Sequence, residues 1–202
     1  MFTSSEYADE TFTGVESADS DVRFKTFDNC TFSKCHFNGV RFVECRFNAC
    51  RFRQCDLSLA SVKGCIFSGV EFTGSKLTGV NWTDANWRTM SLLKPLAFDN
   101  CTLNYGTFIG LTLRKLALTH CVAHDVDFTE ADLTQADFRH TDLTDSRFHH
   151  TNLTEANFAH ARGYSIDAGA NKLKKTKFAL PEAISLLRSL DIVLLDEGEE
   201  GE

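Results

Sequence analysis

The chain has 202 residues, 43% of them hydrophobic, and a formal net charge of -7 at pH 7. That length and composition favour one soluble domain with enough chain to bury a core. No apolar run approaches the roughly 20 residues of a membrane-spanning helix, and the start of the chain lacks the basic and apolar regions of a signal peptide. We therefore expect a cytoplasmic protein with no membrane partner, whose eight cysteines are reduced.

Residues 1–25 precede the regular part of the sequence and are predicted to form an N-terminal cap or an irregular first coil. From Phe27 onward, a large apolar residue, the centre, recurs every five positions. One run of centres ends at Trp87, and after a one-residue slip near residues 88–97 a second run extends from Phe98 to Phe158. Two positions before the centres lies a second inward series, which holds every cysteine of the chain: Cys30, Cys35, Cys45, Cys50, Cys55, Cys65, Cys101 and Cys121.

A period of five fits neither an α-helix, with its period of 3.6, nor a β-strand, with its period of 2. A solenoid accommodates it, because each five residues can form one side and one turn of a coil. Successive coils would stack about 4.8 Å apart, as neighbouring strands do. The sequence therefore predicts an all-β solenoid over residues 26–161, with both series pointing inward and the other three positions facing water.

The best-preserved repeats read "ADLTQ", "ADFRH", "TDLTD" and "TNLTE". This pattern resembles the pentapeptide-repeat family, and the resemblance covers about residues 26–161. It implies a right-handed quadrilateral β-helix, whose four sides take 20 residues per coil. We expect about six or seven coils on that basis.

Two further stretches resemble one branch of that family, which protects DNA gyrase from poisons. They are "GVNWTDANW" (79–87) and "FALPEAISLLRSLDIVLLD" (178–196). The branch includes quinolone-resistance proteins and the albicidin and microcin B17 immunity proteins, of which the albicidin-immunity protein is the most similar. Many quinolone-resistance members carry a long insertion between repeats, and this sequence shows none.

Residues 162–202 form a separate C-terminal segment. Pro181 fits the first turn of a helix, and the apolar residues from Ala183 to Leu190 follow at helical spacings. Residues 192–195 read as a short strand before an acidic tail. Such a helix either caps the open end of the solenoid or joins it to a second copy, and the resemblance favours a homodimer. The expected dimer residues are Phe178, Leu180, Ile184, Leu187, Leu190, Ile192 and Leu194.

We expect no enzyme, no cofactor and no metal. The cysteines lie on the inward series beside Val and Ala, where Cys acts as a small hydrophobe. His120, His140 and His160 are 20 residues apart and should stack on one side of a four-sided coil. A metal ladder there is conceivable, but the repeat itself produces ladders of like residues. No nucleophile and base pair is recognisable, and no Gly-rich phosphate loop follows a strand.

Surface charge is unevenly distributed along the sequence. Basic residues exceed acidic ones by five between Val22 and Cys65, whereas acidic residues exceed basic ones by four between Cys101 and His160. Carboxylates repeated along a rod offer a field like that of DNA, which carries one negative charge per roughly 1.7 Å of its axis. The candidate contacts are Asp125, Asp127, Glu130, Asp132, Asp137, Asp142, Asp145 and Glu155, with Asp127, Asp132, Asp137 and Asp142 foremost.

The resemblance and the charge pattern together predict a DNA mimic. Its expected partner is bacterial DNA gyrase, with topoisomerase IV as a second candidate, and its expected effect is protection from a poison such as albicidin or a quinolone. No direct contact with nucleic acid is expected. Two alternatives stay open: the charges serve solubility alone, or the chain is a structural or adaptor β-helix with no topoisomerase partner.

Overall fold

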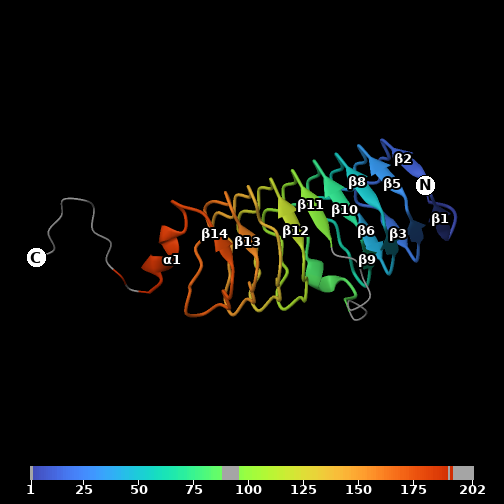
Figure 1. The fold of residues 1–202 in the computed structure, drawn as a ribbon. Helices are drawn as coiled ribbons and strands as arrows, with labels where there is room; N and C mark the ends of the chain where they lie inside the picture. Colours follow the sequence, from blue (N-terminus) through green and yellow to red (C-terminus); the bar gives the residue numbers. More distant parts are fainter. Residues whose placement is uncertain (1, 88–95, 191, 193–202) are drawn as a thin grey trace, which may run out of the picture.

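The computed structural model describes residues 2–87, 96–190 and 192. The chain winds into a rod of about 8 turns, with the N-terminus at one end and a short helix at the other (Figure 1). The predicted four-sided solenoid is confirmed. The expected six or seven coils were too few, because the residues assigned to an N-terminal cap or an irregular first coil form a paired first coil and residues 172–178 add to the last one.

The strands are short and all pair in parallel between successive coils. Side 1 carries β1 (Glu6–Ala8), β4 (Thr26–Asp28), β7 (Arg46–Asn48) and β9 (Ile66–Ser68). Side 2 carries β2 (Thr11–Thr13), β5 (Thr31–Ser33), β8 (Arg51–Arg53), β10 (Glu71–Thr73), β11 (Ala97–Asp99), β12 (Ala117–Thr119), β13 (Asn157–Phe158) and β14 (Lys177–Phe178). Side 3 is held by isolated bridges such as His36 with Asp56, and side 4 by β3 (Asp21–Arg23), β6 (Arg41–Val43) and further bridges.

The register between coils fixes the length of each turn. Phe32 pairs with Phe52, and Phe52 with Phe72, each 20 residues further along the chain. Phe72 instead pairs with Phe98, so this turn takes 26 residues. The slip expected near residues 88–97 is therefore one extra repeat plus one residue, and most of that segment, 88–95, lies outside the described residues.

Between the sides, the chain turns sharply at the residue two positions after each centre, the corner residue. Corner residues have positive φ angles, for example 54° at Asp125 and 72° at Gly79, except at Asp84, where a 3-10 helix (Trp82–Asp84) forms the turn. Asp and Asn tolerate this left-handed conformation better than most residues, and Gly tolerates it freely. At Gly79 there is a second constraint, because a Cβ atom would lie 2.7 Å from Cδ2 of Leu59 in the preceding coil. The absence of a side chain at Gly79 therefore leaves room for the Leu59 side chain to pack against this corner.

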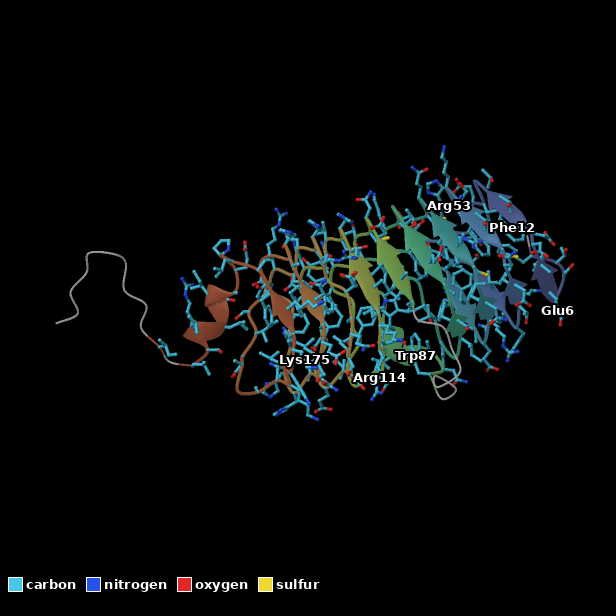
Figure 2. The ribbon with its side chains drawn as sticks, viewed as in Figure 1. Glu6, Phe12, Arg53, Trp87, Arg114 and Lys175 are labelled. Carbon is cyan, nitrogen blue, oxygen red and sulfur yellow. The ribbon has the colours of Figure 1, made fainter. Side chains whose placement is uncertain are left out.

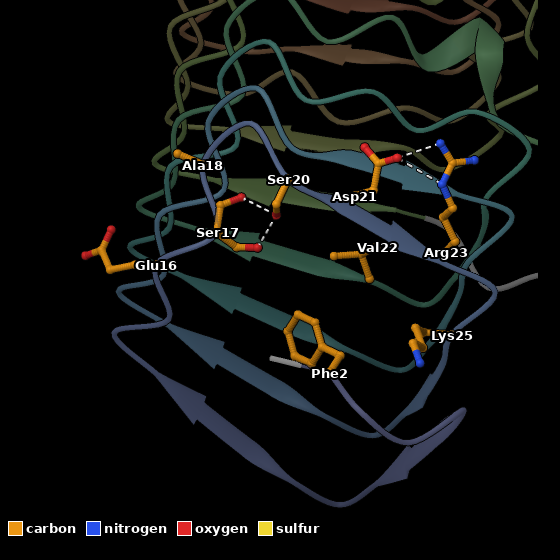
Figure 3. A pocket seen from close by; sticks show the side chains of 9 residues that line it. All are labelled: Phe2, Glu16, Ser17, Ala18, Ser20, Asp21, Val22, Arg23 and Lys25. Atoms are coloured by element: carbon orange, nitrogen blue, oxygen red, sulfur yellow. Dashed lines mark hydrogen bonds and ion pairs between the residues drawn. The ribbon is translucent and has the colours of Figure 1, made fainter.

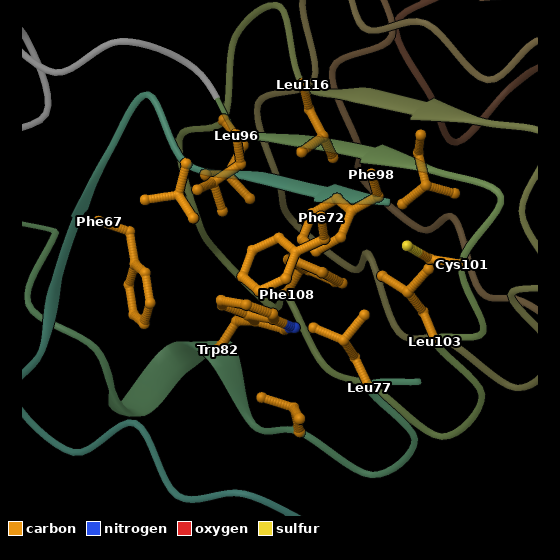
Figure 4. Close-up of a cluster of buried hydrophobic side chains, with 14 of the residues drawn as sticks. Phe67, Phe72, Leu77, Trp82, Leu96, Phe98, Cys101, Leu103, Phe108 and Leu116 are labelled. Atoms are coloured by element: carbon orange, nitrogen blue, oxygen red, sulfur yellow. The ribbon is translucent and has the colours of Figure 1, made fainter. Parts of the chain in front are cut away.

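The centres fill the rod as stacked columns, as predicted. Phe27, Phe47 and Phe67 lie on one another with ring centroids 5.2 Å apart. Trp82 stacks on Phe108 at 5.8 Å within the cluster shown in Figure 4. Such aromatic contacts add to the stabilisation from apolar burial. The rod therefore has one continuous core along its length.

All eight cysteines are buried and free, which confirms their inward assignment. They form four stacked pairs in which the partners are 20 residues apart, such as Cys30 with Cys50. Their thiols contact backbone carbonyls: Sγ of Cys50 lies 3.2 Å from the carbonyl oxygen of Phe27. Burial raises the pKa of Cys50 to about 12, which disfavours the reactive thiolate.

We expect a thiol reagent at pH 8 to label most of these cysteines slowly in the native protein and rapidly after denaturation, because the reagent needs both access and thiolate. Absorbance during titration with a disulfide reagent measures both rates. Fast labelling of most of the eight thiols in native protein would contradict the packing.

The two ends of the rod are closed differently. At the N-terminus, Phe2 covers part of the first coil, with its ring 5.2 Å from those of Phe12 and Phe27. At the C-terminus, α1 (Ile184–Arg188) packs Leu186 against the core. The expected helix up to Leu190 was too long, because turn structure surrounds α1, and Pro181 precedes it by three residues. The expected strand 192–195 lies outside the described residues except for Ile192. In the described part of the chain, no helix has the length and apolar character needed to cross a membrane.

Candidate partner-binding surface

The four foremost acidic candidates occupy the position just before the centre, each on a different side of the rod. Asp127 lies on side 4, Asp132 on side 1, Asp137 on side 2 and Asp142 on side 3. In each case Oδ1 accepts a hydrogen bond from the N–H two residues later, for example from Thr129 to Asp127 at 2.9 Å and from Thr134 to Asp132 at 3.1 Å. Asn152 and Asn157 accept equivalent bonds. These carboxylates therefore hold the turn that follows each centre.

Each of these four carboxylates also pairs with an arginine. The pairs, with their N to O distances, are Asp127 with Arg147 (3.5 Å), Asp132 with Arg114 (2.7 Å), Asp137 with Arg139 (2.7 Å) and Asp142 with Arg162 (2.9 Å). The four Asp side chains are only 15% to 26% exposed. They encircle the rod and much of their charge is neutralised, so they do not form one acidic stripe.

Hydrogen bonding also changes how readily these carboxylates protonate. Partial burial acts to raise the pKa of Asp142, but bonds from the Thr144 hydroxyl and N–H, together with His124 and Arg162, outweigh it and lower the pKa to about 2. Burial likewise opposes a lowered pKa at Asp132 and Asp137, where Thr134, Arg114 and Arg139 supply the bonds. The charged forms are thus favoured in the folded state.

The lowered pKa of Asp142 predicts a pH-dependent contribution to stability. The carboxylate stabilises the fold above its ordinary pKa of 3.8, and this contribution is lost as the pH falls toward about 2. Asp142→Asn should therefore be less stable than the parent at pH 7, by less than about 1 kcal/mol, because the Arg162 side chain is 69% exposed and water screens the pair. Urea unfolding at pH 7, 4 and 2.5 should show the two proteins converging, whereas a constant difference would contradict the assignment.

The other four acidic candidates are exposed corner residues with positive φ: Asp125, Glu130, Asp145 and Glu155. Glu155 accepts a hydrogen bond from Nε2 of Gln135 at 2.8 Å. The carboxylates of Asp125, Glu130 and Asp145 have no hydrogen-bond or ion-pair partner among the described residues. Asp125 and Asp145 stack in adjacent coils at the corner between sides 3 and 4, where the N–H of Asp125 bonds to the carbonyl of Thr144 at 3.1 Å.

Side 3 carries further acidic residues that sequence reasoning did not select. Glu16 and Asp56 lie on it in the N-terminal half, Asp19 lies at its corner with side 4, and its basic residues in the described chain are Lys76 and Arg162. Successive five-residue repeats lie on different sides of the rod, so a count of charges along the chain could not reveal this. The position within each repeat could have revealed it, because residues 20 apart share a side. Six of the 28 acidic residues belong to the last 12 positions of the sequence, after the repeats.

The histidine ladder is formed as predicted. The ring centroids of His120 and His140 lie 4.9 Å apart, and those of His140 and His160 lie 4.8 Å apart. Nδ1 of His120 contacts Oδ1 of Asp99 at 3.1 Å. Across residues 2–87, 96–190 and 192, no group of three His, Cys, Asp or Glu side chains is arranged to hold a metal ion. The ladder is a surface stack of like residues.

A depression of about 600 Å³ lies at the N-terminal end (Figure 3). Phe2 and Val22 line it beside Ser17, and Asp21 at its edge pairs with Arg23 at 2.6 Å. The residues that line it include no histidine or cysteine.

The expected dimer residues gather at the C-terminal end. Phe178 is half-buried, with its ring 5.2 Å from that of Phe158. The others within the described chain are exposed: Leu180, Ile184, Leu187, Leu190 and Ile192. Leu194 lies outside the described residues. This end therefore presents an uncovered apolar surface in the single chain.

Comparison with known proteins identifies the repeats and the fold. Two family descriptions match: "Pentapeptide repeat region" over residues 25–94 and "Pentapeptide repeats (8 copies)" over residues 124–158. No significant match was found among curated protein sequences.

Several solved structures have a similar fold. A trypsin-treated variant of QnrB1, a plasmid-mediated fluoroquinolone resistance protein, superposes with a TM-score of 0.74 at 20% identity, covering 95% of this chain and 99% of that one. Full-length QnrB1 gives 0.58 at 18% identity, covering 90% and 100%. HetL from Nostoc sp. strain PCC 7120, involved in heterocyst differentiation regulation, gives 0.59 at 16% identity, covering 87% and 90%. At these identities the likeness concerns the fold.

Proposed function

Because the chain is a pentapeptide-repeat protein, we propose that it binds bacterial DNA gyrase, with topoisomerase IV as a second candidate, and protects it from a poison such as albicidin or a quinolone. The observation that carries this proposal is the pair of unpaired carboxylates at Asp125 and Asp145, stacked on one corner of a straight rod. The fold shared with QnrB1, a fluoroquinolone-resistance protein, supports it.

The physical basis is mimicry of the charge on DNA. Side chains in adjacent coils repeat about every 4.8 Å, a regular spacing that a surface built to bind phosphates can accommodate. Glu130 adds an unpaired carboxylate on the neighbouring corner of the same region. Asp127, Asp132, Asp137 and Asp142 contribute less, because their arginine partners neutralise them. We therefore place the gyrase contact at the corner between sides 3 and 4.

A homodimer through the C-terminal end completes the proposal. The apolar residues there, including Leu187 and Leu190, would be buried between two copies, and charges are disfavoured at the centre of such an interface. The resulting particle would be a longer rod with an acidic corner on each half. Its expected location is the cytoplasm, and it would act by binding and not by catalysis.

Replacing Leu187 and Leu190 with Lys should convert the dimer to a monomer of 22.6 kDa, because paired lysines would be buried in the interface. Light scattering at micromolar concentration measures the mass. Leu59→Lys is the matched control, since Leu59 is 71% exposed on a distant corner, and it should leave the mass unchanged. An unmodified protein that is already monomeric would mean that α1 only caps the rod.

The adaptor alternative has a specific observation in its favour. Four of the eight acidic residues between Cys101 and His160 are compensated by arginine: Asp127, Asp132, Asp137 and Asp142. An adaptor rod would need no uncompensated acidic corner and no topoisomerase. Binding of purified gyrase to the immobilised protein distinguishes the DNA mimic from the adaptor. A DNA mimic should bind gyrase with an affinity that falls as salt is added, whereas an adaptor without a topoisomerase partner should not bind gyrase.

A further inference from the structure

The last coil carries a group of exposed lysines without partners. Lys172 and Lys174 lie on side 1, Lys175 at the next corner and Lys177 in β14 on side 2. We call these four residues the lysine rim, and Figure 2 shows Lys175 on the outer surface near the C-terminal end. None of the four ammonium groups has a hydrogen bond or ion pair among the described residues.

This charge differs from that of the neighbouring coils. Arg114, Arg139, Arg147 and Arg162 each pair with an aspartate, as described above. Glu155 precedes Lys175 in the same corner column, and its carboxylate, which accepts a hydrogen bond from the neutral amide of Gln135, can offset only one of the four positive charges. The rim is therefore a concentrated positive charge, with an excess of lysine over acidic partners, at one end of the rod.

The position of the rim creates an electrostatic problem for the proposed dimer. An interface through the C-terminal end would bring the rims of two copies toward each other. Like charges facing across an interface oppose association, and screening by salt relieves the opposition only in part. A dimer at low salt therefore needs a counter-charge near the rim.

The chain itself carries such a counter-charge. Residues 196–202 read "DEGEEGE", with five acidic residues and no basic one. This acidic tail begins four residues after Ile192, the last described residue. The 10 residues from Ile192 to Glu202 can span up to about 35 Å at roughly 3.5 Å per residue. A tethered segment within such reach has an effective concentration on the order of millimolar.

We propose that the acidic tail, residues 196–202, binds the lysine rim of its own chain. The contact needs no fixed geometry, since five carboxylates meet four ammonium groups. Its consequence rests on the dimer of the proposed function: with the rim neutralised, two rods can approach end to end. The interaction surface is thus polycationic, and its occupant is an acidic peptide encoded by the same chain.

Carbodiimide cross-linking of the full chain tests the contact itself, because the reagent joins a carboxylate directly to a lysine. Mass spectrometry should find the tail glutamates linked to the rim, with the yield falling as NaCl rises from 50 to 500 mM. Lys34 and Lys63 are the matched controls, since both are exposed lysines of the N-terminal half. The proposal would be overturned if no cross-link joined the tail to the rim lysines. It would also be overturned if the tail were cross-linked to Lys34 and Lys63 as often as to the rim.

A charge-neutral tail of the same length tests the consequence. Asp196→Asn with Glu197→Gln, Glu199→Gln, Glu200→Gln and Glu202→Gln should raise the dimer Kd by about tenfold at 50 mM NaCl, and added salt should then strengthen the dimer. Changing the four rim lysines to Gln in that background should restore the parent Kd. An unchanged Kd and salt response would overturn this role of the tail. A monomeric parent would contradict the dimer alone, and the cross-links would still decide the contact.

Discussion

Replacing Phe138 with Asp should unfold the C-terminal half of the rod. The Phe138 side chain is 0% exposed, its ring stacks on Phe158 at 4.8 Å, and the ring of Phe128 meets it edge-on at 5.7 Å. Removing such a ring alone costs about 3 to 5 kcal/mol. An unpaired carboxylate in the same place costs several kcal/mol more. Urea unfolding followed by circular dichroism measures the loss, and residual structure should be confined to the N-terminal coils.

The matched control is Phe24→Asp. Phe24 is also a phenylalanine of the repeat region, but it lies at a corner and is 64% exposed. Its replacement should change the free energy of unfolding by no more than about 0.5 kcal/mol. Equal destabilisation by the two substitutions would contradict the distinction between centres and corners.

Changing Asp125 and Asp145 together to Asn should weaken gyrase binding by about tenfold at low salt, because two unpaired carboxylates are lost from the proposed contact. Neither side chain has a partner in the described chain, so the fold should be unaffected. Surface plasmon resonance against purified gyrase at several salt concentrations measures the change. The double variant should also show a shallower salt dependence than the parent.

Two sets of substitutions locate the effect. Asp19→Asn with Glu44→Gln removes two exposed carboxylates from the N-terminal coils and should change binding little, although Asp19 lies in the same corner column as Asp125, because the proposed contact is confined to the C-terminal coils. Neutralising Arg41, Arg46 and Arg51 should also have little effect. If the N-terminal carboxylates matter as much as Asp125 and Asp145, the contact lies elsewhere or depends on total charge alone.

Changing Asp127, Asp132, Asp137 and Asp142 together to Asn tests whether the turn-holding carboxylates contribute to gyrase binding. Asn152 and Asn157 show that an amide oxygen can accept the turn hydrogen bond, so the fold should persist. Four arginines would lose their partners, so any loss of gyrase binding would combine lost negative charge with newly exposed positive charge.

The core was readable from the sequence because each repeat carries the same two inward positions. Burial of a Phe or Cys depends on its place within five residues, so Phe138 and Cys50 could be assigned without coordinates. The sequence left residues 1–25 open between a cap and an irregular first coil because Ser17 replaces an apolar centre there, although Tyr7, Phe12 and Val22 continue the period. The length of the 26-residue turn was not predicted, because one whole extra repeat does not change the five-residue phase of the centres. Only the one additional residue is visible as a slip in the sequence.

The candidate surface was less predictable, because chain order hides which residues share a side. Asp127 and Asp132 are five residues apart but lie on adjacent sides, whereas Asp125 and Asp145 are 20 apart and stack. The distinction between turn-holding and free carboxylates also depends on position in the repeat. An Asp before the centre meets an N–H two residues later, and an acidic residue at a corner meets solvent. The length of α1 depends on packing against the last coil, which helical spacing alone does not report.

The most direct test of the central claim is supercoiling by purified gyrase, with and without this protein, in the presence and absence of albicidin and a quinolone. The account predicts that the protein restores supercoiling in the poisoned reaction at a concentration that leaves the unpoisoned reaction active, and that the Asp125→Asn, Asp145→Asn variant restores less. Supercoiling that the protein leaves unchanged in every condition, together with no binding to gyrase at low salt, would contradict it.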